Sequence, residues 1–207
     1  MKCWRCNGSG SVLQEFQDVG WVSKICPICH GKGEEKLSNK DILLLVNVQN
    51  GFRNEYTDNM MKELGKFIFE YQFSKIMVTK FLNFQDSLYV KELEFNSMMT
   101  PEQQDIVPEI KPSVTAIHLK SKYNCVDETF LKQLQVLNSG KTPSQVLIAG
   151  VNTETSVLAT ATGLFDAGIR PIILTDFVAS AHGDENHQYG LKIMETMFGK
   201  QNLLKLG

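Results

Sequence analysis

The sequence predicts a three-layer α/β fold, in which helices cover both faces of a mainly parallel sheet, preceded by a small cysteine-rich module. Two observations predict the main fold: short, continuously apolar runs recur along the chain, and amphipathic stretches lie between them. A third observation sets the module apart, because four of the five cysteines fall near the N-terminus. We therefore expect two parts, residues 1–38 and residues 39–207.

Composition places the chain among ordinary globular proteins, with 43% hydrophobic and 21% charged residues. The formal net charge of -2 leaves no broad basic surface for nucleic acid or anionic lipid. No apolar run approaches the ~20 residues that a membrane span requires, and no apolar region follows Lys2 as a secretory signal would require. We therefore expect a cytoplasmic protein without membrane contact, for which nucleic acid is not the favoured partner.

The N-terminal cysteines form two pairs, Cys3 with Cys6 in CWRC and Cys26 with Cys29 in CPIC. Each pair is followed by an x-G-x-G tail, whose glycines allow the backbone to curl around a metal. Two such turns supply the four thiolates of a tetrahedral zinc site, whereas disulfides are disfavoured in a reducing compartment. Since segments under ~40 residues seldom fold without a metal or a disulfide, the pattern predicts one structural zinc on these four cysteines.

The repeated CxxCxGxG unit resembles the zinc-finger modules of DnaJ-type cochaperones, in which two repeats hold one zinc. Between the pairs, residues 12–25 alternate apolar and polar side chains and predict a small hairpin with Gly20 near its turn. No basic run flanks this hairpin. Contact with a protein partner or with the body of the same chain is therefore expected in preference to nucleic acid.

The main domain is predicted to begin at about Asn39. Five apolar runs have the length and composition of strands buried on both faces: 42–48, 75–79, 114–119, 145–149 and 171–175. The amphipathic stretches between or after them predict helices over 57–73, 128–137, 154–167 and 185–198. Thr57 or Asp58 is expected to cap the first helix, and Gly168 to end the third in a left-handed conformation.

In a sheet of this kind, ligands bind beyond the carboxyl ends of the strands. Three segments at such positions carry polar side chains: VNVQNGF at 46–52, HLKSKYN at 118–124 and IAGVNTETSVLATATGLFDAG at 148–168. Because parallel strands end at the same edge, these segments are expected to surround one pocket.

Taken in order, the three segments resemble the isochorismatase-like family of cysteine hydrolases, which includes nicotinamidases. In that family the first strand ends in D-x-Q-x-x-F, a lysine follows the third strand, and the fourth strand leads into G-V-x-T-x-x-C-V. The matching stretches here are N-V-Q-N-G-F from Asn47, then Lys120, then G-V-N-T-E-T-S-V from Gly150. The resemblance spans residues 40–207 and implies a Rossmann-like sheet, a pocket for a small-molecule ligand and a homo-oligomer.

Two of the three family catalytic positions are substituted in this sequence. Asn47 stands at the position of the acid and Ser156 at the position of the nucleophile, while Lys120 is kept. A helix N-terminus contributes about 0.3–1 kcal/mol, which does not ionise a serine without a base. Since losing members of a nucleophile–base unit costs on the order of 10⁴–10⁶ in rate, a catalytically impaired member of the family that acts in ligand or protein binding is the leading hypothesis.

The resemblance also assigns residues around the pocket. It places Gln49 and Phe52 in the pocket wall, and it maps a non-proline cis peptide of the family to Val151–Asn152. The Asp-x-His arrangement that holds a metal in nicotinamidases has no counterpart, because Asp86 in VTKFLNFQDSLYV is not followed by a histidine. A catalytic metal is therefore not expected.

Three functions stay open at this point, and with them the question of whether the chain is an enzyme. The first is the catalytically impaired protein that acts in ligand or protein binding. The second is a hydrolase of a small amide or ester that uses Ser156 with Lys120 as its base. The third is a zinc-dependent adaptor that contacts protein or RNA. Of the other reactive residues, Cys125 is expected to be a buried thiol and His187 a packing or capping residue.

Overall fold

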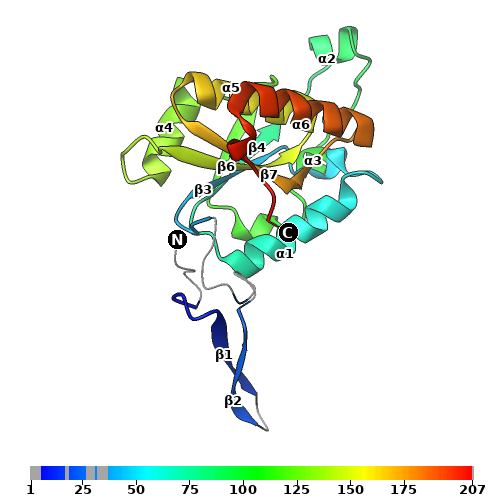
Figure 1. Cartoon of the computed structure of the whole chain (residues 1–207). Helices are drawn as coiled ribbons and strands as arrows, with labels where there is room; N and C mark the ends of the chain where they lie inside the picture. Colours follow the sequence, from blue (N-terminus) through cyan, green and yellow to red (C-terminus); the bar gives the residue numbers. More distant parts are fainter. Residues whose placement is uncertain (1–5, 17–18, 27–30, 32–36, 207) are drawn as a thin grey trace.

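The computed structural model describes residues 6–16, 19–26, 31 and 37–206. Figure 1 shows a body of helices and strands and, at the N-terminal end of the chain, a separate two-stranded hairpin. The strand order of the sheet in the body is β5-β4-β3-β6-β7-β8, and all neighbours are parallel. These strands are β3 (Ile42–Val46), β4 (Ile76–Phe81), β5 (Ala116–Lys120), β6 (Gln145–Val151), β7 (Arg170–Ala179) and β8 (Leu203–Leu204).

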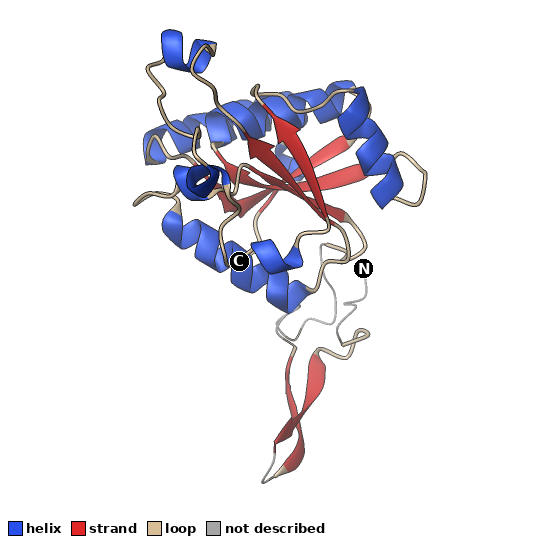
Figure 2. Ribbon diagram, turned by 180° about the vertical axis from the view of Figure 1, so that it is seen from behind, coloured by secondary structure: helices blue, strands red, loops and turns tan. Residues whose placement is uncertain are grey.

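Helices cover both faces of this sheet, as Figure 2 shows. The α-helices are α1 (Asp58–Tyr71), α2 (Leu88–Lys91), α3 (Pro101–Gln104), α4 (Glu128–Leu137), α5 (Leu158–Asp166) and α6 (Asp184–Phe198). Short 3-10 turns are η1 (Asn50–Phe52), η2 (Lys111–Ser113) and η4 (Lys200–Asn202), and one turn of π-helix, η3 (Thr153–Val157), precedes α5.

The core is divided by the sheet into two apolar layers, because side chains alternate between the faces of a strand. On β3, Leu43 and Leu45 pack in the layer that includes Leu64 of α1. Leu44 packs on the opposite face, with Phe130 of α4 and with residues of α5 and α6. The central strand is therefore buried on both sides, as its continuous apolar run predicts.

The predicted elements of the body are confirmed, with two corrections. The prediction that all five strands are buried on both faces is wrong for β5, which lies at the edge of the sheet and exposes Ile117 and Leu119. Thr57 is the N-cap residue of α1, as predicted, but it forms no side-chain capping bond to the helix, because its hydroxyl donates 2.7 Å to the carbonyl of Phe52. Gly168 adopts a φ of 75° after α5, as predicted.

The N-terminal hairpin consists of β1 (Ser11–Phe16) and β2 (Gly20–Ile25), which pair antiparallel as predicted. Cys6 and Cys26 are buried and pack in one cluster with Val12. The other two predicted zinc ligands, Cys3 and Cys29, lie outside the described residues. Within the part of the chain that is described, no set of three or more His, Cys, Asp and Glu residues is placed to hold a metal ion.

None of the helices in the described segments combines the length and the apolar composition needed to cross a bilayer.

Candidate functional site

A cavity of about 270 Å³ opens where β3, β4 and β6 end. Its walls are mainly apolar, and its aromatic side chains come from four separate segments of the chain. They are Phe52, Phe81, Tyr89, Phe95 and Tyr123. The rings contact one another: Phe52 stacks on Phe95 with centroids 6.2 Å apart, and Tyr89 meets Tyr123 edge-on at 5.0 Å. Such a wall suits the flat face of a ring-shaped ligand.

Polar side chains line the rest of the cavity. They are Asn47, Asn152, Thr155, Ser156 and His182. The sequence therefore predicted two of the family catalytic positions and one neighbouring residue as parts of one site, and the structure brings Asn47, Ser156 and Asn152 together. No carboxylate or thiol is among the described lining residues.

Asn47 follows β3 with a φ of 53°, a left-handed conformation that asparagine adopts more readily than most residues. Its side chain is buried, and its Oδ1 accepts a 3.4 Å hydrogen bond from the hydroxyl of Thr79. Its Nδ2 has no hydrogen-bond partner among the described residues. An amide at this position can donate to a ligand but has no basic lone pair with which to accept a proton near neutral pH.

Ser156 lies in the single π-helical turn η3, a rare conformation that is frequent at functional sites. The residue is buried, and within the described segments its Oγ has no hydrogen-bond partner. A general base must lie within hydrogen-bond reach of the proton that it removes. The described structure places no such base against this hydroxyl.

The peptide bond between Val151 and Asn152 is cis, as the family pattern predicts. Asn152 lines the cavity, and its Oδ1 accepts a 2.8 Å hydrogen bond from the backbone N–H of Ala181. Val151 is buried in the core and does not line the cavity.

Gln49 is likewise in the core and not in the cavity wall. Its side chain holds two neighbouring segments in place: Oε1 accepts from the backbone N–H of Phe81, and Nε2 donates to the carbonyls of Phe81 and Gln104. The glutamine therefore positions the aromatic wall through Phe81 and does not touch a ligand itself.

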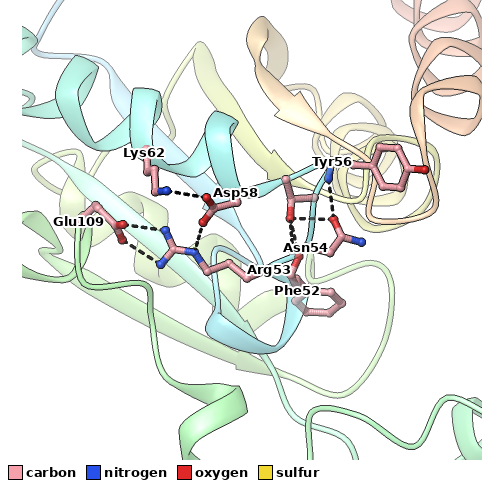
Figure 3. Close-up of polar contacts among 8 residues, drawn as sticks. Phe52, Arg53, Asn54, Tyr56, Asp58, Lys62 and Glu109 are labelled. Atoms are coloured by element: carbon pink, nitrogen blue, oxygen red, sulfur yellow. Dashed lines mark hydrogen bonds and ion pairs between the residues drawn. The ribbon is translucent and has the colours of Figure 1, made fainter.

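Phe52 lines the cavity as predicted, and the segment that follows it is fixed by the polar contacts in Figure 3. The guanidinium of Arg53 forms two hydrogen bonds to Glu109, of 2.6 and 3.2 Å, and one of 2.7 Å to Asp58. Asn54 donates 2.8 Å to the carbonyl of Ala181, in the loop that carries His182. The two loops are thereby tied together beside the cavity.

Lys120, the third family position, is buried at the end of β5 and is not among the residues that line the cavity. Its Nζ donates a 2.8 Å hydrogen bond to the carbonyl of Tyr123. Burial lowers the pKa of this ammonium group to about 8. The side chain remains charged for the most part at neutral pH and lies behind the wall of the cavity.

Sequence reasoning missed His182 and Glu154. His182 lines the cavity, its Nδ1 is 2.7 Å from Oε1 of Glu154, and the same oxygen accepts 2.9 Å from Ser180. His182 follows the end of β7 at the same edge of the sheet, a position that could have identified it. Tyr89, Leu93 and Phe95 could not have been found, because the segment that carries them has no readable pattern.

The remaining candidates, Cys125 and His187, do not line the cavity. Cys125 is buried outside the cavity lining, with its sulfur 3.5 Å from the hydroxyl of Thr160, and burial raises the pKa of its thiol. His187 packs at the start of α6, where its Nδ1 is 2.8 Å from the Thr153 hydroxyl, and burial lowers its pKa. Both outcomes agree with the sequence predictions.

Comparison with known proteins identifies the fold and the family. The chain is similar in structure to an isochorismatase-like hydrolase from Alkaliphilus metalliredigens, with a TM-score of 0.65 and 21% identity over 77% of this chain and 92% of that chain. It is similar to a pyrazinamidase/nicotinamidase from Streptococcus mutans, with a TM-score of 0.62 and 17% identity over 77% and 97% of the two chains.

A third similar structure is a ribonuclease from Caenorhabditis elegans, with a TM-score of 0.57 and 18% identity over 77% of this chain and 75% of that chain. At these identities the likeness shows a shared fold. No curated protein matches the sequence.

The sequence itself gives the family assignment. Residues 41–202 match the family model for the isochorismatase domain, which covers most of the chain and nearly all of the α/β body. The chain belongs to the isochorismatase family.

Proposed function

We propose that this isochorismatase-family protein binds a small molecule in the cavity and does not perform the hydrolysis that a cysteine, a carboxylate and a lysine carry out together. The observation that carries the proposal is the lining of the cavity, where Asn47 and Ser156 stand at the acid and nucleophile positions. No group of the described residues is within hydrogen-bond reach of the Ser156 hydroxyl to accept its proton.

The expected decrease in the rate of hydrolysis is large enough to favour loss of the activity over a partial decrease. Removing a nucleophile or its base typically costs on the order of 10⁴–10⁶ in rate, and here both positions differ. The cavity has a mainly apolar, aromatic wall, which supplies binding without chemistry.

The dimensions of the cavity favour a ligand with one substituted ring. A cavity of about 150 Å³ accommodates benzene, so about 270 Å³ leaves space for a ring with one or two small substituents. Among the similar structures is one whose name describes a nicotinamidase, an enzyme named for a single-ring amide. That likeness supports the size class of the ligand.

The test restores the carboxylate at position 47 and the thiol at position 156. The double variant Asn47→Asp/Ser156→Cys is assayed against a panel of small amides and esters beside the wild-type protein. We expect measurable hydrolysis by the double variant and none above background by the wild type, because the variant regains a thiol and a proton acceptor. Each single variant serves as a matched control and is expected to remain inactive.

Wild-type turnover that disappears in Ser156→Ala contradicts the proposal. Such a result favours the second candidate, a hydrolase in which Lys120 activates Ser156. The specific observation in favour of that candidate is the pKa of Lys120, which burial lowers to about 8, within the range of a general base. Against it, Nζ of Lys120 donates to the carbonyl of Tyr123 and does not line the cavity.

For the N-terminal module we propose a structural zinc site formed by Cys3, Cys6, Cys26 and Cys29, and a role in contacting a protein partner. Cys6 and Cys26 support the metal site: they pack in one cluster, and the backbone N–H of Gly10 donates 3.2 Å to the sulfur of Cys6. A sulfur that accepts a backbone N–H is favoured as a thiolate ligand.

Metal analysis of the purified protein is the test of the zinc site. One zinc per chain is expected, and its loss is expected in Cys6→Ser but not in Cys125→Ser. Retention of the metal in Cys6→Ser would show that it binds elsewhere.

A further inference from the structure

Among the described residues, Lys120 is a buried cation without a carboxylate partner, and its charged neighbour by titration would be the Cys125 thiol, whose pKa burial raises. Its side chain is almost fully excluded from solvent, and its Nζ donates a hydrogen bond to the neutral carbonyl of Tyr123. In the described part of the chain no carboxylate forms an ion pair with it. Burying an unpaired charge is costly, so structures normally supply a counter-charge or shift the group toward its neutral form.

The ammonium group lies directly behind the cavity. Lys120 is the register partner of Phe81 in the pairing of β5 with β4, and it donates to the backbone of Tyr123. Both Phe81 and Tyr123 line the cavity. Their rings and backbone, and not bulk water, therefore separate the charge from a bound ligand, so the field of the charge is only weakly screened there.

The polar groups that face the cavity are hydrogen-bond donors and are suited to a ligand with hydrogen-bond acceptors. Nδ2 of Asn47, Nδ2 of Asn152 and the hydroxyl of Ser156 have no hydrogen-bond partners among the described residues, and each can donate. A carboxylate accepts such bonds through two oxygens, whereas a neutral amide offers one carbonyl oxygen.

The neighbouring carboxylates do not form an ion pair with Lys120. Glu154, two residues before Ser156, is bonded through Oε1 to Ser180 and His182, and its buried Oε2 has no hydrogen-bond partner among the described residues. Asp127 caps α4 by accepting from the N–H of Phe130 and pairs with Lys122. Neither residue lines the cavity.

We propose that the ligand of this cavity is a small planar monoanion, a ring that carries one carboxylate, whose charge takes the place of the counter-ion that Lys120 lacks. This inference rests on the proposed binding function and names its ligand class. A carboxylate at position 47 would supply a negative charge near Lys120 and would repel an anionic ligand. The neutral amide of Asn47 allows the ligand to supply that negative charge instead.

The test compares two probes of the same shape, benzoate and benzamide, by calorimetry or equilibrium dialysis at neutral pH. We expect the wild-type protein to bind benzoate tighter than benzamide by on the order of tenfold to a hundredfold, as a weakly screened buried charge behind the cavity wall implies. Asn47→Asp and Lys120→Met are each expected to abolish this preference for benzoate over benzamide.

Matched controls carry the same chemical changes outside the site. Asn59→Asp on the exposed face of α1 and Lys122→Met on the surface loop after β5 are expected to keep the preference for benzoate. A shift of the wild-type unfolding temperature by benzoate, absent in Lys120→Met, provides a second readout. Replacing a buried unpaired charge by methionine is not expected to prevent folding.

Equal affinity for the two probes, or failure of both to bind, overturns the anion inference. Equal affinity leaves the proposed binding function standing, because the cavity still takes a ring. Hydrolysis of benzamide by the wild-type protein refutes the proposed function instead. The two failures are therefore distinguishable in the same set of measurements.

Discussion

At the scale of single residues, the most consequential position is Asn47. It keeps the buried place after β3 that the family pattern predicts, but its amide replaces a carboxylate. Under the two proposals above, an amide at this position supplies neither a proton acceptor for the site nor a counter-charge for Lys120. One residue therefore links the proposed loss of hydrolysis with the proposed preference for an anion.

The titration of Lys120 gives a test that does not need a ligand. Its pKa falls from 10.5 to about 8 on folding, so between these values the unfolded chain binds more protons and stability rises with pH. The cost of the buried charge is present below pH 8 and is relieved on the order of 2–3 kcal/mol as pH approaches 10.5. Urea unfolding at several pH values, wild type against Lys120→Met, measures this difference.

Lys120→Met is expected to be more stable than the wild type at pH 7 and to lose that advantage at high pH. Neighbouring groups do not obscure the comparison, since burial raises the pKa of the Cys125 thiol and raises that of Tyr89 to about 12. A stability difference that is independent of pH between 7 and 10 would contradict this account of the buried ammonium.

The positions of Asn47, Lys120 and Ser156 could be predicted from sequence, because each follows a strand in a recognisable frame. The core position of Gln49 and the contact of His182 with Glu154 could not be predicted. Gln49 turns its amide to Phe81 and Gln104, and His182 lies against Glu154 of another segment, contacts that depend on how segments distant in sequence pack. Local pattern carries no information on such contacts.

At the scale of elements, the continuously buried strands and long amphipathic helices were the predictable parts. The strand β8 spans Leu203–Leu204, too short for any periodic pattern, and α2 and α3 have four residues each. A strand was predicted over residues 114–119 and is observed as β5 over Ala116–Lys120, but its place at the edge of the sheet depends on strand order, which the local run of apolar residues does not contain.

The segment between β4 and α3 supplies much of the aromatic wall of the cavity, and the side chain of Asn83 joins the two ends of this segment by hydrogen bonds. Nδ2 of Asn83 donates to the carbonyls of Phe95 and Ser97, and Oδ1 accepts from the hydroxyl of Ser87. We expect Asn83→Ala to weaken benzoate binding about tenfold, because the loss of these bonds releases Tyr89 and Phe95 from their positions.

The matched control is Asn96→Ala, in the same segment, whose side chain makes a local contact to Glu94. It is expected to bind benzoate as the wild type does. If Asn83→Ala binds benzoate normally although it unfolds at a lower temperature, Asn83 contributes to stability alone and does not position the wall.

At the scale of the whole molecule, the N-terminal module and the α/β body are expected to respond separately to metal removal. Both tryptophans of the chain, Trp4 and Trp21, lie in the module, so tryptophan emission reports on it alone. A chelator is expected to change this emission and to leave the thermal transition of the body, followed by far-ultraviolet circular dichroism, at the same temperature.

Metal removal that lowers the unfolding temperature of the body would show that the two parts are coupled. An emission spectrum that does not respond to the chelator would contradict the zinc site. The homo-oligomer implied by the family resemblance stays a prediction, and sedimentation of the same samples measures it.

The central claim is that the cavity no longer holds a reactive nucleophile at position 156. Peptide mapping by mass spectrometry, after brief exposure to an activated acetyl ester at neutral pH, tests it most directly. The account predicts an unmodified Ser156 peptide in the wild type and an acetylated peptide at position 156 in Asn47→Asp/Ser156→Cys. Stoichiometric acetylation of Ser156 in the wild-type protein would contradict it.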